Sequence, residues 1–223
     1  MNKFKVLATF VFVTAILIFS SQNSFSQAFL WEFGVEGGAG LRSQRVTNVD
    51  LDSLKKTTIG FIGGVSGQYN LNEMYSLKLG AYYERKGQKY ESSNGVMAED
   101  NHDYLNIPLL LKAKFGNKIK FFVNAGPFIG VLLKSKSKSS PPDIDDDNTS
   151  SYKKTEIGIS GGAGVIIPAG RSMNITFEVR DDFGLTNIFK SELSIFNAEV
   201  KTNNINLMAG ISFLLGKKTM PRR

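Results

Sequence analysis

Apolar and polar residues alternate with a period of two over most of the chain after residue 28. This is the period of a β-strand whose two faces meet different surroundings, because successive side chains point to opposite sides of a sheet. No segment past residue 28 carries a sustained apolar stripe at helical spacing. Eight alternating runs are found, at residues 29–40, 59–69, 75–84, 105–115, 121–133, 156–167, 174–180 and 205–213.

The connections between these runs alternate between long and short. In chain order they are 44–56, 70–74, 92–102, 116–118, 135–153, 168–172 and 186–202. The short ones contain turn-forming residues, such as Gly116-Asn117 and Pro168-Ala169-Gly170. Tight turns at one end and long loops at the other are typical of outer-membrane barrels. The pattern therefore predicts an all-β fold, an eight-stranded antiparallel up-and-down transmembrane β-barrel.

One face of the runs holds nearly all of their charged residues. A hydrocarbon surface offers these residues no water, so they are expected to point into the barrel lumen. An eight-stranded barrel is only wide enough for side chains to fill it, so six acids and six bases are expected to pair in a plugged lumen rather than line a pore. The predicted structural charge network consists of Glu32, Glu36, Arg42, Lys78, Glu84, Lys86, Lys112, Lys114, Glu156, Glu178, Arg180 and Asp182.

Three residues conflict with this pattern. Asp181 falls on the lipid-facing parity of its run, which requires either a bulge or a position near the outer rim. Pro108 and Pro127 lie inside runs, where each removes a hydrogen-bond donor from the ladder. Because a closed barrel has no free edge, bulges are expected at both prolines.

The first residues resemble a secretory signal. A basic start is followed by an uncharged run over residues 6–19, too short for the roughly 20 residues of a spanning helix, and then by Ser24-Phe25-Ser26. We expect a cleavable signal peptide at 1–26, a barrel at 27–216 and a basic tail at 217–223; an uncleaved anchor is the alternative. The predicted location is the bacterial outer membrane, with both termini in the periplasm.

Composition narrows the possible partners. The chain has no cysteine, so neither a disulfide framework nor a lipid-bearing cysteine is possible. Lys3 and Lys5 lie in the predicted signal, which leaves +5 of the formal charge of +7. A nucleic-acid partner does not suit an exported chain. The expected partners are outer-membrane lipid, lipopolysaccharide and other envelope proteins. The basic segment 134–138 could meet lipopolysaccharide phosphates, but a mobile loop flank is the more ordinary interpretation.

Several short motifs resemble the PorT-like outer-membrane β-barrel family of diderm bacteria, and their order along the mature chain is the family's. The resemblance implies an eight-stranded outer-membrane barrel and assigns no activity, although the protein that gives the family its name serves a secretion system. The motifs are Tyr82-Tyr83-Glu84-Arg85-Lys86-Gly87, Tyr104-Leu105-Asn106-Ile107-Pro108-Leu109-Leu110-Leu111-Lys112, Gly126-Pro127-Phe128-Ile129-Gly130, Gly161-Gly162-Ala163-Gly164 and Gly184-Leu185-Thr186-Asn187-Ile188.

Candidate chemistry is sparse, and neither an enzyme, a cofactor nor a metal site is expected. His102, the one histidine, stands beside Asp103. The pair could form an Asp–His site at the barrel rim, but a lone surface histidine is the simpler interpretation. The acidic segment 143–148 begins like a calcium loop and then fails at Asn148 and Lys154. The glycine clusters at 37–40 and 161–164 precede no helix and are not phosphate loops.

Four hypotheses follow for the function. The favoured one is a structural or partner-binding membrane component, for example of a secretion or envelope complex. The others are a small channel, a rim enzyme that uses His102, and a soluble lipid- or ligand-binding barrel of lipocalin type, which would place apolar residues inside.

Overall fold

The structure, a computed structural model, describes residues 31–47, 55–56, 58–91, 97–140, 144–190 and 199–215. The predicted signal peptide and basic tail lie outside these residues. The elements are β1 (Trp31–Thr47), β2 (Lys55–Lys56), β3 (Thr58–Asn70), β4 (Tyr75–Glu91), β5 (Met97–Phe115), β6 (Lys120–Ser140), β7 (Ile144–Asp147), the 3-10 turn η2 (Thr149–Ser151), β8 (Thr155–Pro168), β9 (Met173–Gly184) and β10 (Glu199–Leu215).

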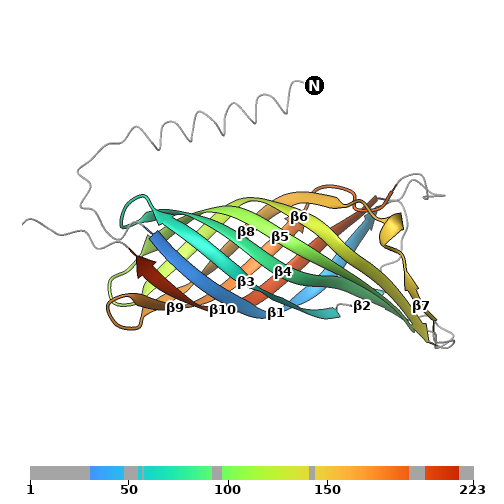
Figure 1. Cartoon of the computed structure of the whole chain (residues 1–223), viewed down its shortest axis with the longest axis horizontal. Coiled ribbons are helices and arrows are strands. Elements are labelled where there is room, and N and C mark those ends of the chain that lie inside the picture. Colours follow the sequence, from blue (N-terminus) through green and yellow to red (C-terminus); the bar gives the residue numbers. More distant parts are fainter. Residues whose placement is uncertain are drawn as a thin grey trace, which may run out of the picture.

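Eight long strands form a closed antiparallel barrel (Figure 1). Each pairs with its neighbour along the chain, in the order β1, β3, β4, β5, β6, β8, β9, β10, and the pairing of β10 with β1 closes the wall. Every ladder is antiparallel, from Trp31 opposite Leu215 at one end of the seam to Thr47 opposite Glu199 at the other. The predicted fold class, an eight-stranded up-and-down barrel, is confirmed.

Short turns join the strands at one end of the barrel, hereafter the turn end. In the first of them, the Asn72 side-chain oxygen accepts hydrogen bonds from the backbone N–H groups of Met74 and Tyr75, at 2.8 and 2.6 Å. Gly116 and Gly170 occupy the other two turns with φ of 103° and 96°, a region that favours glycine. The turn chemistry expected from the sequence is therefore present at all three positions.

The opposite end, hereafter the loop end, is more ordered than the sequence suggested. Residues 97–102 and 135–140 were predicted to be loop, and this was wrong, because β5 and β6 pair through them to Met97 opposite Ser140. Segment 134–138 alternates lysine with serine and has no apolar face to reveal a strand. Its backbone groups form ladder hydrogen bonds with β5 beyond the apolar belt. These extensions of β4, β5 and β6, with β2 and β7 on their edges, form a projecting sheet at one side of the loop end (Figure 1).

The outer wall carries a belt of exposed apolar side chains. Along β1 it runs from Trp31 to Leu41, and polar residues take over at Ser43. Aromatic rings gather at the turn end, where the rings of Trp31 and Tyr69 meet edge to face at 5.0 Å. A wide apolar band with aromatic margins is the surface that a lipid bilayer requires of a barrel. No helix long and apolar enough to cross a membrane occurs among the described residues.

The two prolines do not cause bulges, so that prediction was wrong. Around Pro108 and Pro127 some ladder pairs are missing, yet the register is the same on both sides of each gap. A one-residue shift would turn every later side chain to the opposite face, whereas Leu110 and Phe128 are buried in the lumen as the alternation demands. The described β5–β6 ladder instead shifts between Asp103 and Tyr104, at the edge of the belt.

Asp181 also causes no bulge. It pairs in regular register with Ile205 and Gly161 and points outward. Ile205 pairs in turn with Leu41, which is the last apolar residue of the belt on β1. Asp181 therefore lies near the loop-end rim, which is the second of the two explanations expected from the sequence.

Candidate functional site

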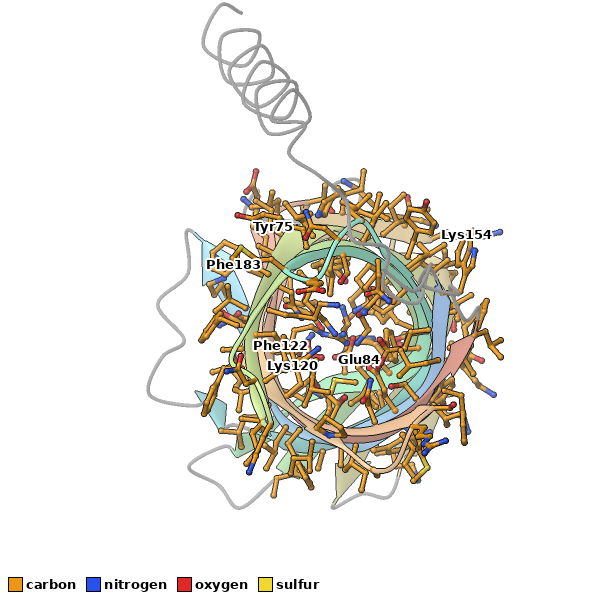
Figure 2. All side chains as sticks on the ribbon, turned by 90° about the vertical axis from the view of Figure 1, so that its left-hand side faces the viewer. Tyr75, Glu84, Lys120, Phe122, Lys154 and Phe183 are labelled. Carbon is orange, nitrogen blue, oxygen red and sulfur yellow. The ribbon has the colours of Figure 1, made fainter. Side chains whose placement is uncertain are left out.

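The interior of the barrel is the first candidate site, because charged side chains fill it (Figure 2). All twelve residues of the predicted network face inward. Ten of them are buried, and Glu36 and Lys114 are partly buried. Figure 2 looks into the barrel from the turn end, with Glu84 and Phe122 inside the ring of strands and Phe183 outside it.

A first ion-pair cluster occupies the loop-end half of the lumen. Lys86 Nζ lies 2.8 Å from Glu156 Oε2 and 3.8 Å from Glu84 Oε2. Arg42 Nη1 lies 3.0 Å from Glu84 Oε1. These side chains come from β1, β4 and β8, so the pairs connect separate parts of the wall through the interior.

Neutral polar side chains donate further hydrogen bonds to the carboxylates of the lumen. Asn106 Nδ2 donates to Glu84 at 3.0 Å, and the hydroxyl of Thr202 donates to Glu156. Asp182 accepts from Asn206 at 3.0 Å and from Ser160. A buried carboxylate is tolerated only when its lone pairs are satisfied in this way.

A second cluster lies nearer the turn end, around Lys78. Its Nζ is 2.7 Å from Glu36 Oε1 and 3.4 Å from Glu178 Oε2. The Tyr82 hydroxyl donates to Glu36 at 2.7 Å, and Asn124 donates to Glu178 at 3.0 Å.

Arg180 lies next to both clusters. Its Nε is 3.4 Å from Asp182 Oδ1, and its guanidinium lies over the Tyr82 ring, 4.6 Å from the ring centre.

Three residues of the predicted network, Glu32, Lys112 and Lys114, form no direct salt bridge in the described part of the chain. Glu32 accepts from Gln68 at 2.9 Å and from Asn174 at 3.0 Å. Lys114 donates to Asn70 at 2.8 Å. Lys112 lies over an aromatic ring, with Nζ 4.3 Å from the centre of Phe122. The structure thus brings nine of the twelve residues into ion pairs and leaves these three to neutral partners.

Aromatic rings inside the lumen were missed as partners of these cations. Lys86 Nζ is 4.8 Å from the centre of the Tyr104 ring and 5.2 Å from that of Phe128. Such contacts are favourable when the cation is shielded from water. The signal was available, because the even-numbered parity that carries the charges of β4 and β5 also carries Tyr82 and Tyr104.

Glycine makes room for these large side chains. A Cβ at Gly158 would overlap the Phe128 ring, and one at Gly184 would overlap the carboxylate of Glu156. Gly158 and Gly184 are therefore packing requirements of the filled lumen.

An apolar cap closes the loop end of the lumen. It is formed by the buried residues Tyr104, Leu132, Tyr152 and Ile188, with Phe189 and Val200 packed against them. Tyr152, directly after η2, comes from the connection between β6 and β8, and Ile188 and Phe189 come from the connection between β9 and β10. A β-bridge between Tyr152 and Phe189 joins the two connections. Sequence reasoning missed this cap, although the apolar residues Tyr152, Ile188 and Phe189 within the predicted outer loops were a signal for it.

Hydrogen bonds fasten the η2 segment to β6. The Ser135 backbone N–H donates to Thr149 Oγ1 at 2.9 Å, and the Ser135 hydroxyl donates to the Asn148 side chain. Asn148 in turn donates to the Ser137 hydroxyl at 2.6 Å.

His102 lies under this cap and not on the surface, so the interpretation as a surface histidine was wrong. Its ring is fully buried, 4.4 Å from the Tyr152 ring, with Nδ1 2.8 Å from Ser135 Oγ. It lies on β5 beyond the outward apolar belt. Burial lowers the pKa of His102 to about 4, and the nearby charge of Lys86 acts in the same direction.

The proposed Asp–His pair is absent. Asp103 points outward, on the opposite face of β5, and accepts two hydrogen bonds from Arg85, at 2.8 and 3.3 Å. Partial burial would raise the pKa of Asp103, but the hydrogen bonds from Arg85 and Tyr83 and the positive charge of Arg85 together lower it. The structure therefore does not bring together the two residues of the proposed rim site.

The structure describes the acidic segment only in part. Asp143 lies outside the described residues, and Asp147 accepts hydrogen bonds from the backbone N–H and hydroxyl of Thr149. Within the described ranges, no three His, Cys, Asp or Glu side chains gather where they could hold a metal ion.

The chain matches one family model and is similar to several solved structures. A family model described as the outer membrane protein beta-barrel domain matches residues 21–190. Neisserial surface protein A is 15% identical, with 82% of this chain and 97% of that chain covered and a TM-score of 0.47. OprG from Pseudomonas aeruginosa is 11% identical, with 87% and 100% covered and a TM-score of 0.48. Ail from Yersinia pestis, solved with the heparin analogue sucrose octasulfate, is 16% identical, with 82% and 99% covered and a TM-score of 0.43. No curated protein matches the chain.

Proposed function

This chain belongs to the outer membrane protein β-barrel family, and we propose that it is a non-conducting integral barrel that acts as a structural or partner-binding component of the outer membrane. Within the family we assign it to the PorT-like group, on the ordered motifs of the sequence. Its twelve lumen charges serve to hold the wall together and to block the interior.

The observation that carries this proposal is the buried charge network beneath the cap. Lys86, Glu84 and Glu156 have side chains that are at most 1% exposed, although they project into the space that a pore would need. An eight-stranded barrel has little room beyond such side chains. Breaking one buried pair would leave an uncompensated charge, which costs about 3–5 kcal/mol, so the pairs resist displacement by ions.

The orientation in the membrane follows from the two ends. Outer-membrane barrels keep their short turns in the periplasm and their long connections outside. We therefore place the turn end, where β1 begins at Trp31 and β10 ends at Leu215, in the periplasm. Both termini of the chain are then periplasmic.

The surface offered to partners is the projecting sheet. The strands β5 and β6 have 19 and 21 residues, whereas β9 has 12, so one side of the wall rises well above the apolar belt. A rigid paired sheet is a better platform for a protein contact than mobile loops, because less conformational freedom is lost on binding. Subunits of a secretion or envelope complex are the partners that the PorT-like resemblance suggests.

Two measurements test the proposal. Purified protein in a planar lipid bilayer is expected to give no step-like conductance, with a known porin as the positive control. Crosslinking in intact cells, followed by detergent extraction and mass spectrometry, is expected to recover a reproducible envelope protein. Discrete conductance steps would instead identify a channel. A purely monomeric protein without partners would contradict the proposal that the chain is part of an envelope complex.

A further inference from the structure

The hydrogen-bond ladder between β4 and β5 is interrupted within the apolar belt. Leu79 and Tyr82 of β4 are paired with β5, whereas Gly80 and Ala81 between them are not. Pro108 stands opposite Gly80 in the continuing register. Because a proline has no N–H, it cannot donate to the carbonyl oxygen of a neighbouring strand. The wall therefore lacks a hydrogen bond at a depth where its outer surface is apolar.

The nitrogen of Pro108 is turned towards β4. On the other side Pro108 remains paired with Phe128 of β6. Residues opposite each other in an antiparallel sheet exchange either both of their hydrogen bonds or none, and a proline cannot form the first kind of pair. The Pro108–Phe128 pair is therefore of the second kind, which directs the backbone of Pro108 at Gly80. Within the described strands the Gly80 carbonyl oxygen has no ladder donor, and no side chain there donates to it.

A hollow of about 580 Å³ opens on the outer wall at this interruption. Gly80, Ala81 and Ile107 line it, together with residues of β1, β3 and β10. Ala81 is small, whereas Phe33 and Leu79 of the same lining are 47% and 53% exposed. Small residues in a membrane-facing surface let a neighbouring protein segment approach closely.

The Gly80 carbonyl oxygen limits what can fill the hollow. The belt faces hydrocarbon, where no water is available to satisfy a backbone oxygen. An acyl chain fills an apolar hollow but has no hydrogen-bond donor. Ser66 belongs to the lining, but its hydroxyl donates to Glu36 in the lumen, at 2.9 Å. The occupant that suits both the lining and the oxygen is an apolar surface that carries one donor.

A second copy of this chain does not supply such a donor. Two copies that span the same membrane meet at equal depth, so the donor would have to lie at the level of Gly80. Among the described outward residues of the belt, hydroxyl groups belong to Tyr69 and Tyr75 near the turn end and to Tyr83 and Thr155 near the loop end. A different protein is therefore the better-suited partner.

We propose that the hollow docks a membrane-embedded segment of another envelope protein, and that a serine or threonine of this segment donates to the Gly80 carbonyl oxygen. Close packing on small residues and hydrogen bonds from hydroxyl side chains hold protein segments together inside membranes. The inference rests on the proposed role as a partner-binding barrel and gives the chemistry of the partner. Pro108, which lies within one of the sequence motifs, then serves to keep this oxygen free.

The test places the photocrosslinker p-benzoylphenylalanine in the full chain in intact cells, either at Leu79 in the hollow or at Ile159 on β8. The two side chains are 53% and 52% exposed, so Ile159 is a matched control elsewhere on the belt. Position 79 is expected to yield one protein adduct, and position 159 only lipid adducts. Mass spectrometry is expected to map the protein adduct to a membrane-embedded segment that contains a serine or threonine.

Two proline variants test the hydrogen bond itself. Pro108→Val restores an N–H opposite Gly80 and should lower the adduct yield at position 79 by about three- to tenfold, the range of hydrogen-bond strengths within membranes. Pro127→Val restores an N–H on the other side of β5 and should leave the yield unchanged. Gel mobility with and without heating checks that both variants are folded.

Lipid adducts or self-adducts alone at position 79 would overturn the inference, as would equal yields from Pro108→Val and Pro127→Val. A crosslinker at Lys134 on the projecting sheet separates this failure from a failure of the proposed function. A protein adduct at position 134 with none at position 79 would leave the proposed function intact. No protein adduct at either position would contradict both.

Discussion

Lys86 Nζ and Glu156 Oε2 are 2.8 Å apart, although the residues are 70 positions apart in sequence and lie on β4 and β8, which are not neighbours in the wall. The pair therefore spans the lumen and connects two parts of the barrel that share no ladder bonds. Because both side chains are buried, the bond is shielded from water and salt. It fixes the shape of the interior as much as it fills it.

Removal of one partner of this pair is expected to be costly. Lys86→Met leaves Glu156 buried without its cation and should lower the free energy of unfolding by about 3–5 kcal/mol. The double variant Lys86→Met/Glu156→Gln should recover part of this loss, because no charge remains unpaired. Urea unfolding in lipid vesicles measures both. Lys118→Met, at an exposed turn position, should change stability by about 0.5 kcal/mol or less. Equal effects of Lys86→Met and Lys118→Met would contradict the buried pair.

The strands that cross the belt were predictable because one face meets an apolar surrounding and the other faces the polar lumen. Leu77 and Leu79 point outward into the apolar belt, while Lys78 points into the lumen. Apolar and polar residues therefore alternate along the strand with a period of two. Above the belt the contrast ends. Segment 134–138 alternates lysine with serine, so both of its faces are polar and the pairing of β6 beyond the belt left no periodic signal.

The partners within the lumen were predictable only in part. Parity shows that Lys86 and Lys112 both point inward, but the distance of each from an acid depends on strand tilt and register. As a result Lys86 meets Glu156, whereas Lys112 meets the Phe122 ring. The burial of His102 could not be predicted for a related reason. The ring that covers it belongs to Tyr152, which lies 50 residues later in the chain.

Two adjacent glycines should respond oppositely to the same substitution. A Cβ at Gly64 would overlap the Ala81 carbonyl and lie 2.7 Å from the Tyr82 Cα, whereas at Gly63 the nearest atom would be 3.9 Å away. Gly64→Ala is expected to destabilise the barrel by about 1–3 kcal/mol. Gly63→Ala should be neutral or stabilise it by up to about 1 kcal/mol, because alanine restricts the unfolded chain. Unfolding in vesicles measures the pair, and equal losses would show that steric crowding is not the cause.

The cap should contribute stability without being the sole barrier. Tyr152→Ala/Ile188→Ala removes two buried cap residues and should cost about 4–8 kcal/mol, as large-to-small changes in a core do. The ion pairs around Lys86 lie below the cap, so the variant is still expected to give no conductance steps in a planar bilayer. If the variant conducted while the wild type did not, the cap alone would be the barrier.

His102 should make the cap sensitive to acid. Its pKa falls from 6.5 to about 4 on folding, so the folded protein disfavours the proton that the unfolded chain accepts. The contribution to stability is therefore complete above about pH 6.5 and is lost as the pH falls towards 4, by about 3 kcal/mol in total. The groups that act on the ring are Lys86, whose charge opposes protonation, and Asp103, whose charge favours it more weakly.

Comparison with His102→Gln isolates this contribution, because the carboxylates that titrate in the same range are common to both proteins. The difference in unfolding free energy between wild type and variant, measured in detergent at pH 7, 5.5 and 4.5, should shift towards the variant as the pH falls. The Tyr152→Ala/Ile188→Ala variant opens the cap to water, so its His102 should titrate closer to 6.5 in a histidine NMR titration. Parallel pH profiles for wild type and His102→Gln would mean that the ring is already solvated and that the cap does not cover it.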